Sequence, residues 1–150
     1  MKKTFTNTRI VRLGVLLAAA LLLSACAAQQ LEVKPIAKSE NPQEVINKLD
    51  HEITLARRNQ VNVLAPSWFA EAEISLNEAK KSLDQGAELS RIFDGVATGR
   101  AQIRRAEEIA KISRTTLPEA IKGRKSARAA GAASLGEDYL AAEVQFLKLT

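Results

Sequence analysis

Apolar residues recur at spacings of three and four along residues 42–117, which predicts a series of amphipathic α-helices. The first helix is expected to begin after Asn41, whose side chain can cap it, with Pro42 in the first helical position. We expect it to end near Asn59 and to be followed by a connection over residues 59–65. Its apolar face consists of Ile46, Leu49, Ile53 and Ala56.

Two longer helices are expected after this connection. The pattern predicts one over residues 66–85, stopped by Gly86, and one over residues 90–116, which would be roughly 40 Å long. Gly95 and Gly99 weaken the first half of the longer helix by about 1 kcal/mol each relative to alanine. We interpret them as positions that admit a neighbouring helix. The two apolar stripes are Phe69, Ala72, Leu76, Ala79 and Leu83, and then Ile92, Val96, Gly99, Ile103, Ala106, Ala110, Ser113 and Leu117.

The pattern continues more weakly beyond Pro118. A short helix is expected over residues 118–130, and a last one that starts near Leu135–Asp138 and carries apolar residues up to Leu149. Such an apolar end needs a partner, so either the chain continues past Thr150 or the domain closes by association. Residues 139–146 also echo residues 69–76 in the order aromatic, alanine, glutamate and large apolar residue, which favours the first alternative if the echo is a true repeat.

Composition agrees with this pattern of helices. Alanine accounts for 21 of residues 26–150, and leucine, glutamate, lysine and arginine, which are strong helix formers, supply much of the remainder. Alanines at the apolar positions allow close approach of the helix axes. The predicted fold is therefore all-α, an elongated antiparallel bundle of coiled-coil-like hairpins formed by residues 42–150.

The N-terminus has the organisation of a secretory signal peptide. An uninterrupted apolar run, Leu13–Leu23, follows a basic segment without acidic residues and precedes the small residues Ser24 and Ala25. This run has 11 residues, far fewer than the ~20 that span a bilayer as a helix. We therefore interpret residues 1–25 as a cleaved signal, with its charges on Lys2, Lys3, Arg9 and Arg12.

The sole cysteine lies directly after this segment, and the sequence Leu23-Ser24-Ala25-Cys26 resembles the lipobox of bacterial lipoproteins. The resemblance implies cleavage between Ala25 and Cys26, a diacylglyceryl unit on the Cys26 thiol and a third acyl chain on its amine. Ala27, where aspartate would favour inner-membrane retention, implies the periplasmic face of the outer membrane. Residues 26–41 would then be the lipidated cysteine and a flexible tether. The alternative is an ordinary signal peptide followed by a chance cysteine.

Most of the positive net charge of the chain belongs to the predicted signal peptide. The whole chain has a formal charge of +5, but four of its 22 basic residues belong to the signal, which leaves 18 against 17 acidic residues. The mature chain is thus close to neutral, at +1. The near-neutral charge of the mature chain and its expected location in the periplasm both argue against nucleic acid as a partner.

The helical body carries a second resemblance. Pro66-Ser67-Trp68 with the alanine–glutamate pattern that follows resembles alanine-rich helical lipoproteins of bacterial envelopes. Some of these carry a C-terminal peptidoglycan-binding domain similar to that of outer-membrane protein A, and residues 66–150 contain none of that domain. The two resemblances imply a non-enzymatic outer-membrane lipoprotein that acts as a periplasmic spacer or interaction module, with a link to peptidoglycan as the leading hypothesis. The alternative is an accessory lipoprotein subunit of an envelope secretion or transport assembly.

No catalytic, cofactor-binding or metal-binding residue is predicted. His51 is the only histidine, and we expect it on a helix surface, because a zinc site would need further cysteine or histidine ligands. Glu71 and Glu73 are expected on different sides of their helix, as are Glu107 and Glu108, so neither pair predicts catalysis by two carboxylates. An envelope hydrolase is accordingly disfavoured, and we expect no small-molecule substrate.

Two further features have both a functional and a structural interpretation. The basic residues Lys122, Arg124, Lys125 and Arg128 could contact phospholipid headgroups or anionic envelope polymers, although a solvated helix face is the simpler interpretation. Trp68 and Phe69 could form an exposed anchor, although we favour a role in fastening the start of their helix to its neighbour.

Overall fold

The structure, a computed structural model, describes residues 31–150. The predicted signal peptide and the lipobox residues Ala25 and Cys26 lie outside these residues. All regular elements of the described part of the chain are helices, which confirms the predicted all-α class.

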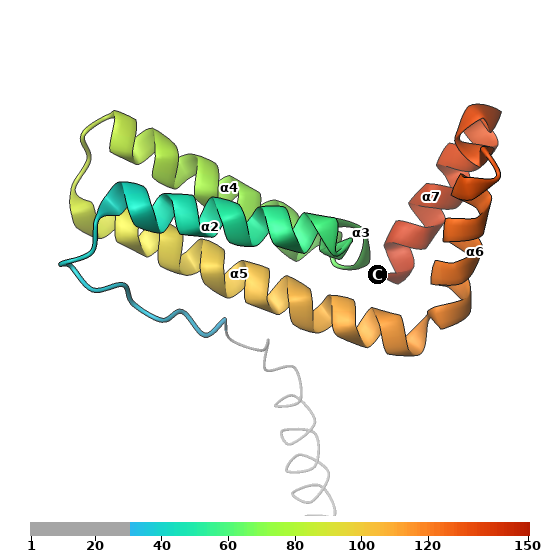
Figure 1. Ribbon diagram of the computed structural model, residues 1–150, viewed down its shortest axis with the longest axis horizontal. Helices are drawn as coiled ribbons and strands as arrows, with labels where there is room; N and C mark the ends of the chain where they lie inside the picture. The colour runs from blue at the N-terminus through green and yellow to red at the C-terminus, as the bar shows by residue number, and fades with distance from the viewer. Residues whose placement is uncertain (1–30) are drawn as a thin grey trace, which may run out of the picture. The chain divides into compact units, whose positions relative to one another are not determined.

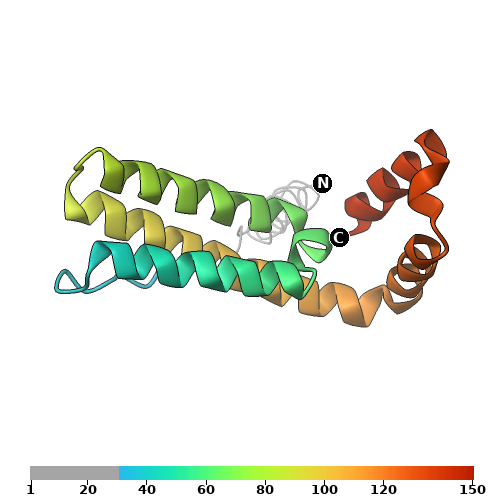
Figure 2. The same ribbon diagram turned by 45° about the horizontal axis from the view of Figure 1, so that its top comes forward.

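Three long helices form an antiparallel bundle. They are α2 (Pro42–Arg58), α4 (Pro66–Asp84) and α5 (Leu89–Thr116). Figures 1 and 2 both show α4 between two chain reversals, running opposite to α2 and α5. The bounds of all three agree with the predicted helices to within one residue.

Local chemistry explains where these helices start. The Asn41 side-chain oxygen accepts hydrogen bonds from the backbone N–H groups of Gln43 (2.9 Å) and Glu44 (3.2 Å), which satisfies two otherwise unpaired donors. Pro42 and Pro66 occupy the first helical positions of α2 and α4, where a missing N–H costs nothing. At the other end of α4, Gly86 adopts a positive φ of 64° and ends the helix.

The core lies where the three apolar stripes meet. The predicted stripe residues of α2 and α4 are buried, except that Leu83 is half-buried against the core. In α5 the buried surface is wider than predicted and also includes Phe93, Ala97, Ala101 and Gln102. The reason is that α5 packs against both α2 and α4, so two of its faces are covered instead of one.

The connection predicted over residues 59–65 contains a further helix, and this part of the prediction needs correction. Residues Val61–Leu64 form the single turn α3, which follows Gln60, the only non-glycine residue with positive φ (61°) among the described residues. Val61 and Leu64 are buried in the core. Four residues are too few to show a helical period, which is why the sequence pattern did not reveal this turn.

A helical hairpin follows the bundle. It consists of α6 (Pro118–Ala129), the 3₁₀ turn η2 (Ala132–Leu135) and α7 (Glu137–Leu149). The chain returns to the bundle at α3, where the Thr150 hydroxyl donates a hydrogen bond to the carbonyl oxygen of Val63 (3.0 Å; Figures 1 and 2). Phe146 is the only buried residue of α7, and α6 has none.

Residues 31–41, the described part of the predicted tether, contain no helix. They do touch the bundle: Ile36 packs against the core, and the Arg104 guanidinium donates a hydrogen bond to the carbonyl oxygen of Glu32 (3.0 Å). Sequence reasoning missed this contact, because a single half-buried isoleucine produces no periodic signal.

Candidate functional site

The predicted lipidation site and cleavage site, Cys26 and Ala25–Cys26, lie outside the described residues. The candidate sites described below therefore belong to the helical body. Two of them are hollows at the end of the bundle where α3 lies.

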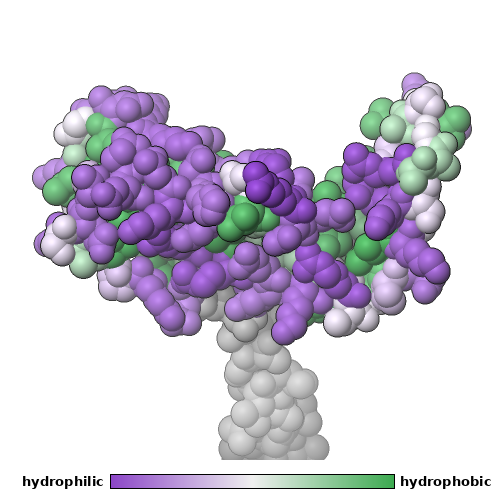
Figure 3. Space-filling view, viewed as in Figure 1, coloured by the Kyte–Doolittle hydropathy of each residue, from purple (hydrophilic) through white to green (hydrophobic). Residues whose placement is uncertain are grey.

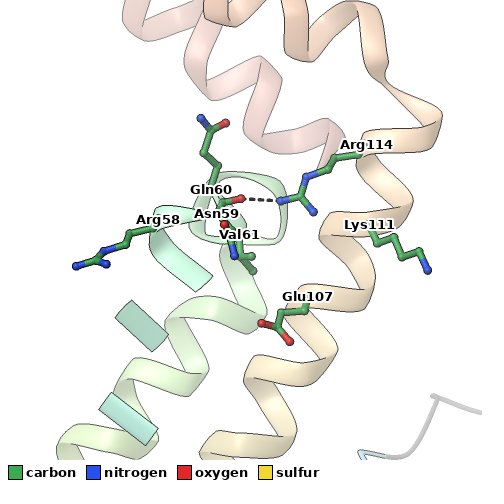
Figure 4. A pocket seen from close by; sticks show the side chains of 7 residues that line it. All are labelled: Arg58, Asn59, Gln60, Val61, Glu107, Lys111 and Arg114. Atoms are coloured by element: carbon green, nitrogen blue, oxygen red, sulfur yellow. Dashed lines mark hydrogen bonds between the residues drawn. The ribbon is translucent and has the colours of Figure 1, made fainter. Parts of the chain in front are cut away.

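The larger hollow is an open polar groove of about 650 Å³ where the turn after α2 meets α5. Its cationic residues come from both sides, Arg58 from α2 and Lys111 and Arg114 from α5. The Arg114 guanidinium donates a 2.6 Å hydrogen bond to the carbonyl oxygen of Asn59, which fastens the turn to α5 (Figure 4). The groove is lined by Arg58, Asn59, Gln60, Val61, Glu107, Lys111 and Arg114.

The charges of this groove do not converge on one point. Figure 4 shows the Arg58 and Lys111 side chains pointing away from one another, with Glu107 between them. Burial raises the pKa of the Glu107 carboxyl, with repulsion from Glu52 as a second cause, while Arg104 opposes the shift. A groove of this kind can attract a carboxylate or phosphate through its cations. It does not place a nucleophile beside a base, as covalent catalysis requires.

The smaller hollow, of about 280 Å³, lies between the bundle and the hairpin. Val63, Leu64 and Phe146 give it an apolar floor, and Lys125 and Arg128 contribute cations. Arg124 also lines this hollow, but its charge is paired. Its Nε and Nη2 atoms donate to one carboxylate oxygen of Glu143 at 3.0 and 2.7 Å. Its guanidinium lies 5.3 Å from the centre of the Phe146 ring.

The other residues singled out from the sequence are dispersed. His51 is exposed on α2, as predicted. Glu73 pairs with Arg57 of α2, whereas Glu71 is exposed on α4. Glu107 lines the polar groove, whereas Glu108 pairs with Arg105 (2.9 Å) along α5. Within residues 31–150, no group of three or more histidine, cysteine, aspartate or glutamate side chains is placed to hold a metal ion.

Trp68 and Phe69 fasten α4 to the core, which is the structural interpretation favoured from the sequence. Phe69 is buried, and the Arg57 guanidinium lies 4.9 Å from the centre of its ring. Trp68 is half-buried against the core. The basic cluster is divided: Lys122, Lys125 and Arg128 are exposed, whereas Arg124 is half-buried in its pair with Glu143.

Sequence reasoning missed the polar groove as a unit. Its residues come from positions about 50 apart, and only the fold brings them together. The local signal was the polar run Arg57–Gln60 at the end of a predicted helix, which marks a turn but not what the turn contacts.

The fold defines the class of this protein as an all-α helical bundle. Within residues 31–150 no helix combines the length and hydropathy needed to cross a membrane. Comparison with protein-family models, curated proteins and solved structures finds no significant match for the chain.

Proposed function

We propose that this chain is a bacterial lipoprotein, acylated on Cys26 and anchored to the periplasmic face of the outer membrane. The observation that carries the proposal is the position of the sole cysteine. It follows the apolar run and the small residues Ser24 and Ala25 at the one place where a lipobox requires it. A single acyl chain gives only marginal membrane binding, so the two or three chains of such a cysteine are needed for a stable anchor.

The contacts of residues 31–36 with the bundle indicate that the tether between Cys26 and the bundle is short. Ile36 packs against the core, and the carbonyl oxygen of Glu32, the residue after Leu31, accepts a hydrogen bond from Arg104, so the chain is held against the bundle from this point on. Only five residue steps separate Cys26 from Leu31, and five extended residues span at most about 18 Å. A lipid anchor on Cys26 would thus hold the bundle next to the membrane surface.

We assign the body itself a non-enzymatic role as a spacer or interaction module between the outer membrane and peptidoglycan. The polar groove supports contact with anionic groups, because Arg58, Lys111 and Arg114 line it on two sides. Carboxylates of the envelope polymers are ligands that such cations attract. Arg58 lies at the end of α2, and Lys111 and Arg114 lie on α5, so these cations are carried by helices of the bundle.

Acyl labelling in cells tests the proposal. Replacing Cys26 with serine removes the acceptor thiol, so incorporation of radiolabelled palmitate should be lost and unprocessed precursor should accumulate. A matched variant, Cys26→Ser with Ser39→Cys, keeps one thiol but moves it to an exposed position outside the lipobox, and it should also stay unlabelled. Undiminished labelling of the Cys26→Ser chain would contradict the proposal.

A further inference from the structure

The hairpin formed by α6, η2 and α7 has a surface unlike that of the bundle. Residues 120–136 contain four basic residues and no acidic one. Three of these cations, Lys122, Lys125 and Arg128, are exposed and form no ion pair within the described part of the chain. Lys125 and Arg128 also line the smaller hollow between the hairpin and the bundle. Between Glu119 and Glu137 the chain is therefore locally positive, with Glu143 of α7 as the carboxylate whose charge acts on Arg128.

Apolar side chains lie in solvent on the same hairpin. At its tip Leu135 is 68% exposed, within a run of alanine and glycine. Along α7, Leu140, Val144 and Leu147 are 62%, 52% and 40% exposed, and their spacing of four and three places them on one helix face. Figure 3 shows white and green surface over the hairpin tip, whereas the surface of the bundle is mostly purple.

From this combination we propose that the hairpin docks onto an anionic phospholipid surface, with its cations on the headgroups and its tip and the Leu140–Leu147 face in the interfacial layer. Cations beside exposed aliphatic side chains are the composition of interfacial membrane contacts. Glu137 and Asp138, which follow the tip, lie in the first turn of α7, where carboxylates offset the positive end of the helix dipole.

A protein partner fits this surface less well. The cores of protein–protein interfaces are enriched in aromatic residues and depleted of lysine. The hairpin has the opposite arrangement. Of its two aromatic residues, Phe146 is buried beneath Arg124 and Tyr139 is half-buried, while leucine, valine and lysine are exposed. An acidic polymer would bind the cations but would leave the exposed leucines in solvent.

The packing of the hairpin also leaves it free to reorient. The 12 residues of α6 include no buried one, and the 13 of α7 include only Phe146. Elements with so few buried contacts open at low free-energy cost. The hairpin can thus adjust to a flat surface while the three-helix core stays intact.

A fluorophore on the hairpin tip tests the proposal in the full chain. Cys26→Ser removes the native thiol and prevents acylation, and Ala133→Cys places a label at the exposed tip. Vesicles of phosphatidylcholine with phosphatidylglycerol, carrying a lipid-bound nitroxide quencher, should quench this label, whereas phosphatidylcholine vesicles should not. A label at Asn77→Cys, exposed on α4, should stay bright in both. Acylation is absent from both labelled chains, and both keep the same residues 1–25. Vesicle binding through that segment is therefore common to both, and the difference between the tip label and the Asn77 label does not depend on the proposed lipid anchor.

Charge-matched variants give the decisive comparison. Lys122→Gln, Lys125→Gln and Arg128→Gln together should lower the ratio of docked to undocked hairpin at least about tenfold. The same number of charges removed from the bundle outside the polar groove, by Lys48→Gln, Lys81→Gln and Arg91→Gln, should leave it within about twofold. All six side chains are exposed, so helical circular dichroism should be unchanged.

Three results would overturn the proposal. One is an unquenched tip label in anionic vesicles, and another is an equal loss in both triple variants, which would reflect net charge alone. The third is protection of the tip label from aqueous iodide by soluble polyglutamate without quenching by the lipid-bound nitroxide. That result would assign the cations to an acidic polymer.

Discussion

At the scale of single residues, close packing gives two glycines of α5 different roles. A methyl group added at Gly99 would lie 2.7 Å from Leu49 Cδ2 and 3.2 Å from Ser75 Cβ, so α2 and α4 both approach α5 at this point. At Gly95 the nearest atom, Ala79 Cβ, would be 3.6 Å away, which is ordinary contact. Only Gly99 is therefore required by the packing of the three helices.

These contacts predict opposite effects for the same substitution one helical turn apart. Gly95→Ala should raise the free energy of unfolding by about 0.5–1 kcal/mol, because alanine favours the helix. Gly99→Ala gains the same helix propensity, but Leu49 is fully buried and cannot move aside cheaply, so overpacking should leave a net loss of about 1–2 kcal/mol. Urea denaturation followed by circular dichroism measures both, and equal signs would contradict the packing argument.

At the scale of elements, most helices were predictable and most contacts between them were not. Pro42, Pro66 and Pro118 each occupy the first position of a helix. In α2, α4 and α5, apolar residues recur at regular helical spacing along the whole helix. The bounds of these helices therefore follow from local signals. The turn α3 escaped because its four residues are ordered by tertiary burial. For the same reason the polar groove, which joins the turn after α2 to α5, could not be predicted.

The echo between residues 69–76 and 139–146 shows how a repeated pattern can meet different surroundings. Ala72 is buried between helices, whereas the corresponding Ala142 of α7 is exposed. The reason is that α4 has long neighbours on two sides, α2 and α5, while the described part of the chain provides α7 with no comparable cover. The sequence pattern predicts the helix in each case, but its burial depends on what lies beside it.

The attachment of α7 to α6 depends on an ion pair whose titration can be predicted. Burial opposes ionisation of Glu143, but hydrogen bonds from Arg124 and Tyr139 outweigh it and lower the pKa of the carboxyl below its ordinary value of 4.5. A lowered folded-state pKa stabilises the hairpin above pH 4.5, and this stabilisation is lost as the pH falls through the folded-state value.

Glu143→Gln should therefore loosen α7 at neutral pH and have little effect in acid. We expect opening of α7 to become about 1–2 kcal/mol easier at pH 7, because Arg124 loses its charged partner in a half-buried position. Hydrogen exchange of α7, corrected for the intrinsic rate at each pH, measures the change. Glu119→Gln, which removes an exposed carboxylate from α6, is the matched control, and similar exchange in both variants would contradict the assigned role.

At the scale of the whole molecule, the contact between residues 31–36 and the bundle sets the reach of the proposed anchor. If residues 27–41 were all free, they would span up to about 50 Å when extended. Docking of Ile36 and Glu32 removes much of this length, so that the remaining steps from Cys26 to Leu31 can span at most about 18 Å. The tether length is therefore a property of the fold as well as of the sequence.

Releasing this segment should move the body of the acylated protein away from the lipid. Ile36→Ser removes a half-buried side chain and Arg104→Gln weakens the hydrogen bond to Glu32, which together should shift the docked-to-free ratio about tenfold. Energy transfer from a fluorophore at Asn77→Cys to a dye in the vesicle surface should fall accordingly. Val33→Ser with Arg91→Gln is the matched control, since both of its residues are exposed. Unchanged transfer in the Ile36–Arg104 variant would show that the docked segment does not limit the reach of the anchor.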